Sequence, residues 1–114
     1  MTALPFDNEH APLYSVGQVA DMLGVQQAFL RRLDSHDVVS PARSGGQQRR
    51  YSRLDVSQVQ EALGLIDEGL TLGGVRRVLA LQEQVRALEA QVAELRAAQA
   101  SQPIARLRPT DRGL

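Results

Sequence analysis

Apolar residues after Ser15 recur at the spacing of one helical face. Ser15 is followed three residues later by Gln18, the capping-box arrangement typical of a helix start. Gly24 can take the left-handed conformation that commonly ends a helix. The pattern therefore predicts a short first helix, whose apolar side is formed by Val16, Val19, Ala20 and Leu23.

A second amphipathic segment follows at once, over residues 26–36. Its apolar positions again lie three and four residues apart, as in a helix that covers a core. Two helices joined by a short turn that contains glycine form a helix-turn-helix. The apolar side of this second helix consists of Val25, Phe29, Leu30 and Leu33.

From Val38 onward the sequence favours strands over helices. Val38 and Val39 are β-branched, and Pro41 is suited to the edge of a sheet. Residues 44–47, Ser-Gly-Gly-Gln, predict a hairpin tip, and residues 49–51, Arg-Arg-Tyr, the returning strand. We therefore expect a basic two-stranded wing next to the helix-turn-helix.

Two more helices are predicted beyond the wing. Ser52 and Asp55 form a second capping box, and Gly69 ends the helix that they begin. Thr71 caps a fourth helix. The apolar residues of the third helix are Leu54, Val56, Val59, Leu63 and Ile66, and those at the start of the fourth are Leu72, Val75, Val78 and Leu79.

No helix-breaking signal separates this fourth helix from the residues that follow it, up to Gln99. A continuous helix over residues 72–99 would be about 40 Å long, and a small domain cannot bury an apolar stripe on so long a rod. The stripe has the a and d spacing of a coiled coil, so we expect a second copy of the chain to cover it. The predicted dimerisation residues are Val78, Leu81, Val85, Leu88, Val92 and Leu95.

The chain of 114 residues has room for one modest domain and an extension. The predicted fold is mainly α, with a winged helix-turn-helix domain, a small β-hairpin wing and a long C-terminal dimerisation helix. We expect a flexible arm at residues 1–12, the winged helix-turn-helix domain at 13–80, the coiled-coil helix at 81–100 and a disordered tail at 101–114.

Composition excludes several classes of protein. There is no cysteine and there are two histidines, so neither disulfides nor a cysteine metal site can form, and no cofactor is expected. No apolar stretch is long enough to cross a bilayer, and no secretory signal is evident, so we expect a cytoplasmic protein. Without a nucleophile–base pair, a carboxylate constellation or a phosphate loop, an enzyme is not expected.

The formal net charge of zero hides an uneven distribution. Between Leu13 and Gln60 there are six arginines and four aspartates, which leaves a net charge of plus two. All thirteen basic residues are arginines, whose planar fork suits phosphate and guanine. For the lack of lysine itself, a codon bias toward arginine is the favoured explanation. The basic cluster at residues 43–53 is thus the main electrostatic indication of DNA binding.

The combination of these motifs resembles the MerR family of transcriptional regulators. The resemblance covers residues 13–79, and Gly-Gly-x-x-Arg-Arg-Tyr-Ser with the uninterrupted fourth helix is most similar to the HspR-like actinobacterial branch. The chain departs from the family pattern at Phe29 and at Arg32-Leu33, so the operator sequence does not carry over. The residues that carry the resemblance are Leu30-Arg31, Asp34, Val38-Val39, Pro41, Arg43 and Arg49-Arg50-Tyr51-Ser52.

The resemblance implies that the second helix enters the major groove and that the wing contacts phosphates. For several residues an alternative remains. Glutamines 26 and 27 are expected to contact DNA, with solvated helix-start residues as the alternative. Phe29 is expected in the core rather than at a thymine methyl, and Tyr51 mainly in the core, with its hydroxyl free for a phosphate. Arg49 or Arg50 can instead pair with Asp34 to orient the wing. The predicted DNA-binding residues are Gln26, Gln27, Arg31, Arg32, Arg43, Arg49, Arg50 and Tyr51.

The function implied is that of a MerR-type transcriptional regulator that binds double-stranded DNA at an inverted repeat. The family pairs the long helix antiparallel in a homodimer and can activate by distorting a promoter; repression by occlusion fits the same residues. No small-molecule effector domain is expected. Residues 104–108 form a short apolar segment with arginines, for which a DnaK-type chaperone is a hypothetical partner. The alternative is a protein-interaction module that docks to RNA polymerase or a sigma factor.

Overall fold

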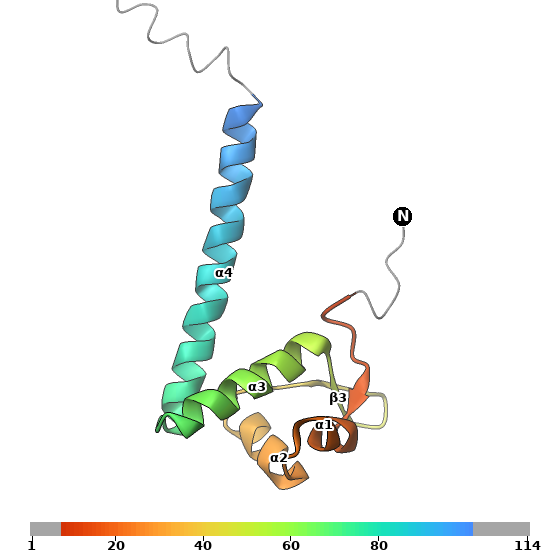
Figure 1. Ribbon diagram of the computed structural model, residues 1–114. Helices are drawn as coiled ribbons and strands as arrows, with labels where there is room; N and C mark the ends of the chain where they lie inside the picture. Colours follow the sequence, from red (N-terminus) through yellow and green to blue (C-terminus); the bar gives the residue numbers. More distant parts are fainter. Residues whose placement is uncertain (1–7, 102–114) are drawn as a thin grey trace, which may run out of the picture. The chain divides into compact units, whose positions relative to one another are not determined.

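The computed structural model describes residues 8–101 of the chain and divides it into two units, Met1–Leu79 and Ala80–Leu114. The first unit contains three short strands, three helices and the start of a fourth, α4, which is shared by both units (Figure 1). The first unit therefore holds the predicted winged helix-turn-helix.

The helix-turn-helix consists of α1, Val16–Leu23, and α2, Gln27–Ser35. Ser15 and Gln18 form the predicted capping box, and Gly24 has the left-handed φ of 67° that ends α1. Gln26 and His36 flank α2 as its caps, so this helix is one residue shorter at each end than predicted. The sequence prediction of this motif is confirmed.

The sheet has one strand more than predicted. Its antiparallel strands are β1, Tyr14–Ser15, β2, Ala42–Arg43, and β3, Arg49–Tyr51, in the order β1-β3-β2. Tyr14 pairs with Tyr51, so β1 covers the outer edge of the wing. A strand of two residues is too short to show alternation in the sequence, which is why it was missed.

The sequence placed Val38 and Val39 in a strand, and this was wrong. Val38 N–H donates to the Leu33 carbonyl at 2.8 Å, so the segment continues the end of α2 as a turn. Both valines are buried. Their β-branched side chains serve the core rather than a sheet.

The predicted tip of the wing is present, but its left-handed position is Gln47, with a φ of 65°, and neither Gly45 nor Gly46. The Ser44 hydroxyl accepts from the backbone N–H groups of Gly46 and Gln48, both at 3.3 Å. The serine side chain thus shapes the turn that the two glycines were expected to shape.

The remaining helices are α3, Arg53–Asp67, and α4, Leu72–Ala100. Ser52 and Asp55 form the predicted capping box at α3, with Ser52 almost fully buried. Thr71 caps α4 by accepting from Gly74 N–H at 3.1 Å. The continuous helix expected from the lack of breakers is therefore present.

One hydrophobic core holds the first unit together. It takes side chains from both helices of the helix-turn-helix, from the wing, from α3 and from the first turns of α4. Burying each large aliphatic side chain contributes about 1.5–3 kcal/mol. The core residues with almost no exposed surface are Val19, Leu30, Leu33, Tyr51, Val59, Ala62 and Val75.

Two backbone hydrogen bonds tie the described N-terminal residues to this unit. Leu54 N–H donates to the Glu9 carbonyl at 3.0 Å, and Leu13 N–H donates to the Tyr51 carbonyl at 3.0 Å. The rest of the predicted arm, residues 1–7, lies outside the described residues, as does the predicted tail beyond Ser101. Nothing along residues 8–101 forms a helix apolar and long enough to span a membrane.

Candidate nucleic-acid interface

The α2 helix divides its side chains between the core and the surface. Leu30 and Leu33 are buried, and Phe29 packs against the core while partly buried, as predicted. The polar side chains Gln26, Gln27, Arg31 and Arg32 are all exposed. The Arg31 guanidinium donates to Gln27 Oε1 at 3.2 Å, one helical turn away. This exposed polar face is available for a ligand.

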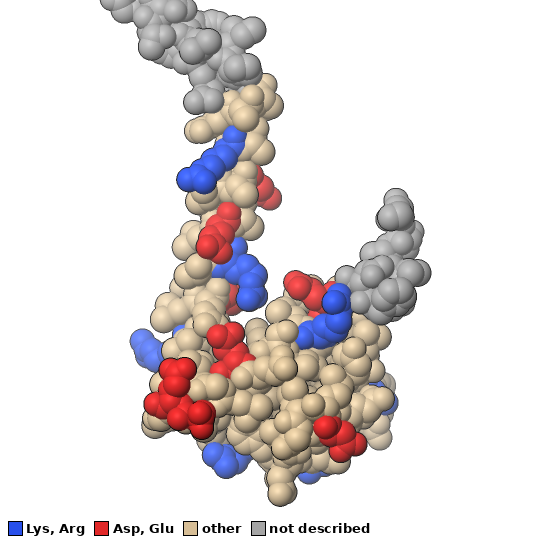
Figure 2. Space-filling model, in the orientation of Figure 1, with Lys and Arg blue, Asp and Glu red and all other residues tan. Residues whose placement is uncertain are grey.

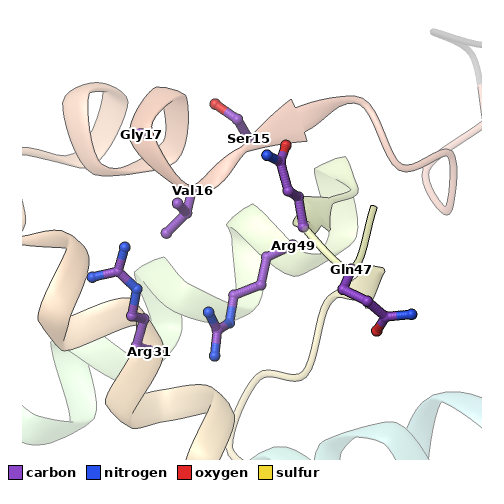
Figure 3. A pocket seen from close by; sticks show the side chains of 7 residues that line it. Ser15, Val16, Gly17, Arg31, Gln47 and Arg49 are labelled. Atoms are coloured by element: carbon purple, nitrogen blue, oxygen red, sulfur yellow. The ribbon is translucent and has the colours of Figure 1, made fainter. Parts of the chain in front are cut away.

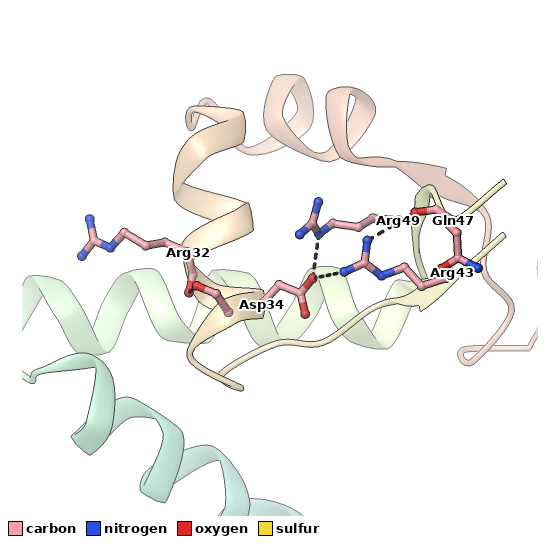
Figure 4. A network of polar contacts seen from close by, with 6 residues as sticks. Arg32, Asp34, Arg43, Gln47 and Arg49 are labelled. Carbon is pink, nitrogen blue, oxygen red and sulfur yellow. Dashed lines mark hydrogen bonds and ion pairs between the residues drawn. The ribbon is translucent and has the colours of Figure 1, made fainter.

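The wing is attached to α2 through Asp34. Arg49 Nε donates to Asp34 Oδ2 at 2.7 Å, and Arg43 Nη2 donates to the same oxygen at 3.0 Å (Figure 4). Arg43 also donates to the Gln47 carbonyl at 3.3 Å. The alternative expected from the sequence was an ion pair of Asp34 with Arg49 or Arg50. That pair is present with Arg49, and Arg43 joins it.

These two arginines differ in their surroundings. The side chain of Arg49 is 22% exposed and that of Arg43 is 42% exposed, while Asp34 retains 13%. Charge-assisted hydrogen bonds are strongest where water is excluded, so Arg49 forms the firmer of the two bonds. Arg43 is the cation that surface ligands can reach more easily.

A hollow of about 440 Å³ lies between the start of α1, the middle of α2 and the wing. In Figure 3 the side chains of Arg31 and Arg49 extend from opposite sides toward this space. The first N–H groups of a helix have no acceptor within it, and the start of α1 contributes such groups here. The hollow suits an anion. Its lining residues are Ser15, Val16, Gly17, Arg31, Gln47, Gln48 and Arg49.

Tyr51 is completely buried. Its hydroxyl has no hydrogen-bond partner among the described residues, and burial raises its pKa, an effect that the nearby positive charge of Arg49 opposes. A side chain without exposed surface cannot contact DNA in this structure. The core role that the sequence favoured for Tyr51 is confirmed, whereas the predicted contact of its hydroxyl with a phosphate has no exposed surface to support it.

The other predicted site residues do not all lie on one side of the domain. Arg31, Arg43 and Arg49 share one side of the domain with Gln27, whereas Arg32 extends from α2 away from the wing (Figure 4). Arg50, half-buried in the middle strand, pairs with Ser15 and Ala42 through the backbone register. The sequence analysis missed the residues of the hollow at the start of α1, although the capping box at Ser15 marks that helix end.

Figure 2 shows the distribution of charge on one face of the molecule. On the face shown in Figure 2, acidic and basic side chains are interspersed rather than gathered into one field. No group of three His, Cys, Asp or Glu side chains within residues 8–101 could hold a metal ion. The arginines around the hollow and the wing are thus the feature that distinguishes this side of the domain.

Comparison with known proteins agrees with this geometry. The family described as "MerR HTH family regulatory protein" matches residues 14–82. The chain belongs to the MerR family. Membership places it among regulatory proteins rather than enzymes, as the sequence analysis expected.

Two curated relatives show how far the MerR similarity extends. The putative heat shock protein HspR of Streptomyces coelicolor is 38% identical over 91 residues, which is 79% of this chain and 60% of that protein. The regulator GlnR of Bacillus anthracis is 35% identical over 77 residues, 68% of this chain and 60% of that protein. The chain thus spans about 60% of the length of these relatives.

Solved structures of MerR proteins share the fold. The N-terminal part of MtaN, the multidrug transporter activator of Bacillus subtilis, has a TM-score of 0.55 and 28% identity, with 82% of this chain and 95% of that chain covered. HiNmlR, a MerR regulator that lacks a sensor domain and was crystallised with promoter DNA, has a TM-score of 0.54, 18% identity and coverage of 89% and 94%. The winged helix-turn-helix and long helix are those of the MerR family.

Proposed function

We propose that this MerR-family chain binds double-stranded DNA sequence-specifically as a homodimer in the cytoplasm and regulates transcription. One observation carries the proposal: Asp34 fastens the wing to α2, so that Arg31, Arg43 and Arg49 lie on the same side of one compact unit. A duplex offers a groove and flanking phosphates at fixed spacing, and such a unit can contact both at once.

Within this proposal α2 lies in the major groove. Gln26, Gln27 and Arg31 are exposed and carry the groups that recognise adenine and guanine edges. The hollow beside Arg49 accepts a backbone phosphate, for which the start of α1 supplies N–H groups. Arg43, at the wing, contacts a second phosphate. Base contacts then give specificity, and the phosphates fix the position of the domain on the duplex.

The homodimer forms through the distal part of α4. The large apolar side chains of its stripe, from Leu81 to Leu95, are each 43–63% exposed in the single chain. Apolar residues at this spacing are normally buried against another helix. The antiparallel arrangement typical of the family places Val85 against Leu88 of the second copy and Leu81 against Val92. Every valine of the stripe then meets a leucine. The stripe consists of Leu81, Val85, Leu88, Val92 and Leu95, with half-buried Val78 at its start.

Spin labels test this arrangement, because the chain contains no cysteine that would compete for the label. We expect labels on Ala87→Cys to lie close together in the dimer. Labels on Ala98→Cys should lie about 35 Å apart along the axis, from a rise of 1.5 Å per residue. Similar distances at both positions would indicate a parallel coil, and no measurable interaction at either would contradict the homodimer.

A protein partner of the C-terminal segment is a separate proposal. Residues 104–108 carry an isoleucine, a leucine and two arginines, and they lie outside the described residues. A chaperone of the DnaK type binds short apolar segments of this kind and is the proposed partner. Removing residues 102–114 should abolish capture of the chaperone and leave duplex binding intact. Unchanged capture would refute this proposal.

A salt titration tests DNA binding itself. Each phosphate contact made by arginine releases condensed counterions, so the affinity for duplex should fall steeply as salt rises. We expect a linear decrease of the logarithm of affinity with the logarithm of salt, with a slope of about −0.9 for each contact. Absence of duplex binding at low salt, with retained binding to RNA polymerase or a sigma factor, would favour the interaction module instead.

A further inference from the structure

Asp34 presents one oxygen to two arginines of the wing. Its Oδ2 accepts from Arg49 Nε at 2.7 Å and from Arg43 Nη2 at 3.0 Å. A backbone phosphate of DNA would present the same chemistry to these arginines, a negatively charged oxygen that accepts hydrogen bonds. Asp34 and a phosphate therefore compete for the same donors.

We propose that Asp34 is a specificity-determining positioning residue. In the free protein it binds Arg43 as a phosphate would. When DNA binds, Asp34 releases Arg43 to a phosphate and keeps its hydrogen bond to Arg49. The inference rests on the proposed function. It concerns the same surface and adds an exchange of partners to it.

The two contacts differ in the way that this exchange requires. The hydrogen bond between Arg43 and Asp34 is the longer of the two, and the Arg43 side chain is 42% exposed. Breaking this bond therefore costs less free energy. The Arg49 contact is shorter, with the side chain 22% exposed, and it uses Nε. The Nη groups of Arg49 remain available to the hollow that it lines. One arginine can therefore leave while the other keeps the wing in place.

The exchange makes the wing selective. In the free protein Asp34 neutralises a cation that would otherwise attract any phosphate. Arg43 moves to DNA only where a phosphate is held at hydrogen-bond distance, which requires α2 to be seated in the groove. Binding to unrelated duplex is then weakened more than binding to the target sequence.

A double-mutant cycle on an unrelated duplex tests the proposal. Asparagine keeps an oxygen that can accept from Arg49 Nε but loses the charge that holds Arg43. We therefore expect Asp34→Asn to raise the affinity by about three- to tenfold at low salt. The slope of the logarithm of affinity against the logarithm of salt should become steeper by about 0.9, the value for one phosphate contact. In an Arg43→Gln background the same change should alter the affinity less than about twofold, because its effect acts through Arg43. Equal changes in both backgrounds, or a loss of affinity in both, would overturn the proposal.

Asp37→Asn is the matched control. Asp37 is exposed near the end of α2, forms no ion pair within the described part of the chain, and has a positive φ that asparagine tolerates. Like Asp34→Asn, the Asp37→Asn substitution removes one negative charge near the C-terminal end of α2. We expect a small change of affinity that is equal in both Arg43 backgrounds; a gain as large as that of Asp34→Asn would overturn the proposal.

The unsubstituted chain, labelled with nitrogen-15 at arginine, provides a measurement that does not depend on a variant. On addition of duplex, the Arg49 Nε–H signal should stay protected from exchange while the Arg43 guanidinium signals shift. Loss of the Arg49 protection, or unchanged Arg43 signals, would overturn the inference. If the unsubstituted chain bound no duplex, the proposed function would fail with it; binding with an additive cycle would refute the inference alone.

Discussion

The Nε group of Arg49 donates to a carboxylate oxygen of Asp34 at 2.7 Å, across fifteen positions of the chain. The bond joins β3 of the wing to the helix that carries the polar face of the proposed DNA-binding site. A two-stranded hairpin is only marginally stable by itself, so the orientation of the β2–β3 hairpin relative to α2 depends on contacts such as this ion pair. The geometry of the site therefore rests on this pair as well as on the core.

Arg49→Gln should destabilise the domain more than Arg43→Gln. The first change removes a short bond in a partly buried place, and we expect it to lower the free energy of unfolding by about 1–2 kcal/mol. The second removes a more exposed contact and should cost less than about 1 kcal/mol. Urea unfolding of both variants measures the difference. A larger loss for Arg43→Gln would show that the wing is held in another way.

Tyr51→Phe should leave the domain as stable at neutral pH or stabilise it by about 1–3 kcal/mol. The change removes a buried hydroxyl that has no hydrogen-bond partner among the described residues, while the ring remains in the core. Thermal unfolding at pH 7 is the measurement. Tyr14→Phe, at a half-buried position that pairs with Tyr51 in the sheet, is the control for removing a hydroxyl. A marked loss of stability in Tyr51→Phe alone would indicate that the hydroxyl has a partner.

The same variant should change the dependence of stability on alkaline pH. Burial raises the pKa of Tyr51 above its ordinary value of 10.0, so the folded state favours the neutral form. As pH rises above 10, the unfolded chain loses this proton before the folded one, and the free energy of unfolding falls. Tyr51→Phe removes this contribution. An identical decline above pH 10 in both proteins would contradict the assignment.

Much of this fold could be predicted because its signals are local. The capping boxes at Ser15 and Ser52 and the left-handed Gly24 depend on side chains and backbone a few residues apart. The continuation of α4 to Ala100 follows from the absence of glycine and proline over residues 75–100. For these elements the short-range pattern and the tertiary structure agree.

The predictions from sequence were wrong where contacts between distant residues determine the local structure. Val38 and Val39 have high strand propensity. Their conformation is determined instead by burial in the core and by the hydrogen bond of Val38 N–H to the Leu33 carbonyl at the end of α2. Tyr14 forms a strand because it pairs with Tyr51, thirty-seven positions later, and the Tyr51 ring is buried in a core built from several elements. Asp34 likewise pairs with both Arg43 and Arg49 because of the way the wing folds against α2. The spacing of residues in the sequence does not predict that both arginines pair with it.

Arg31→Ala should weaken binding to the target sequence by about 1–3 kcal/mol and reduce discrimination against unrelated duplex. Arg31 lines the hollow beside Arg49 and belongs to the polar face of α2. Arg32→Ala is the matched control, since its exposed side chain extends away from the wing (Figure 4). Fluorescence anisotropy with both duplexes measures the effect. A larger loss for Arg32→Ala would mean that the opposite flank of α2 faces the DNA.

Leu88→Asp should convert the dimer to a monomer. Leu88 lies in the middle of the exposed stripe of α4, where a charge would be buried at the proposed contact between copies. Ala90→Asp is the control, because it places the same residue in the same turn but outside the a and d positions. Sedimentation equilibrium distinguishes the two. Dimers in both variants would contradict a role of the stripe in dimerisation.

Selection from a random pool of duplexes tests the central claim most directly, since the full chain chooses its own binding site and the selected sequences are then determined. A dimer with two winged heads should enrich an inverted repeat whose half-sites have a fixed spacing, and each duplex should bind two chains. Enrichment of a single half-site bound by one chain, or no enrichment above the starting pool, would contradict it.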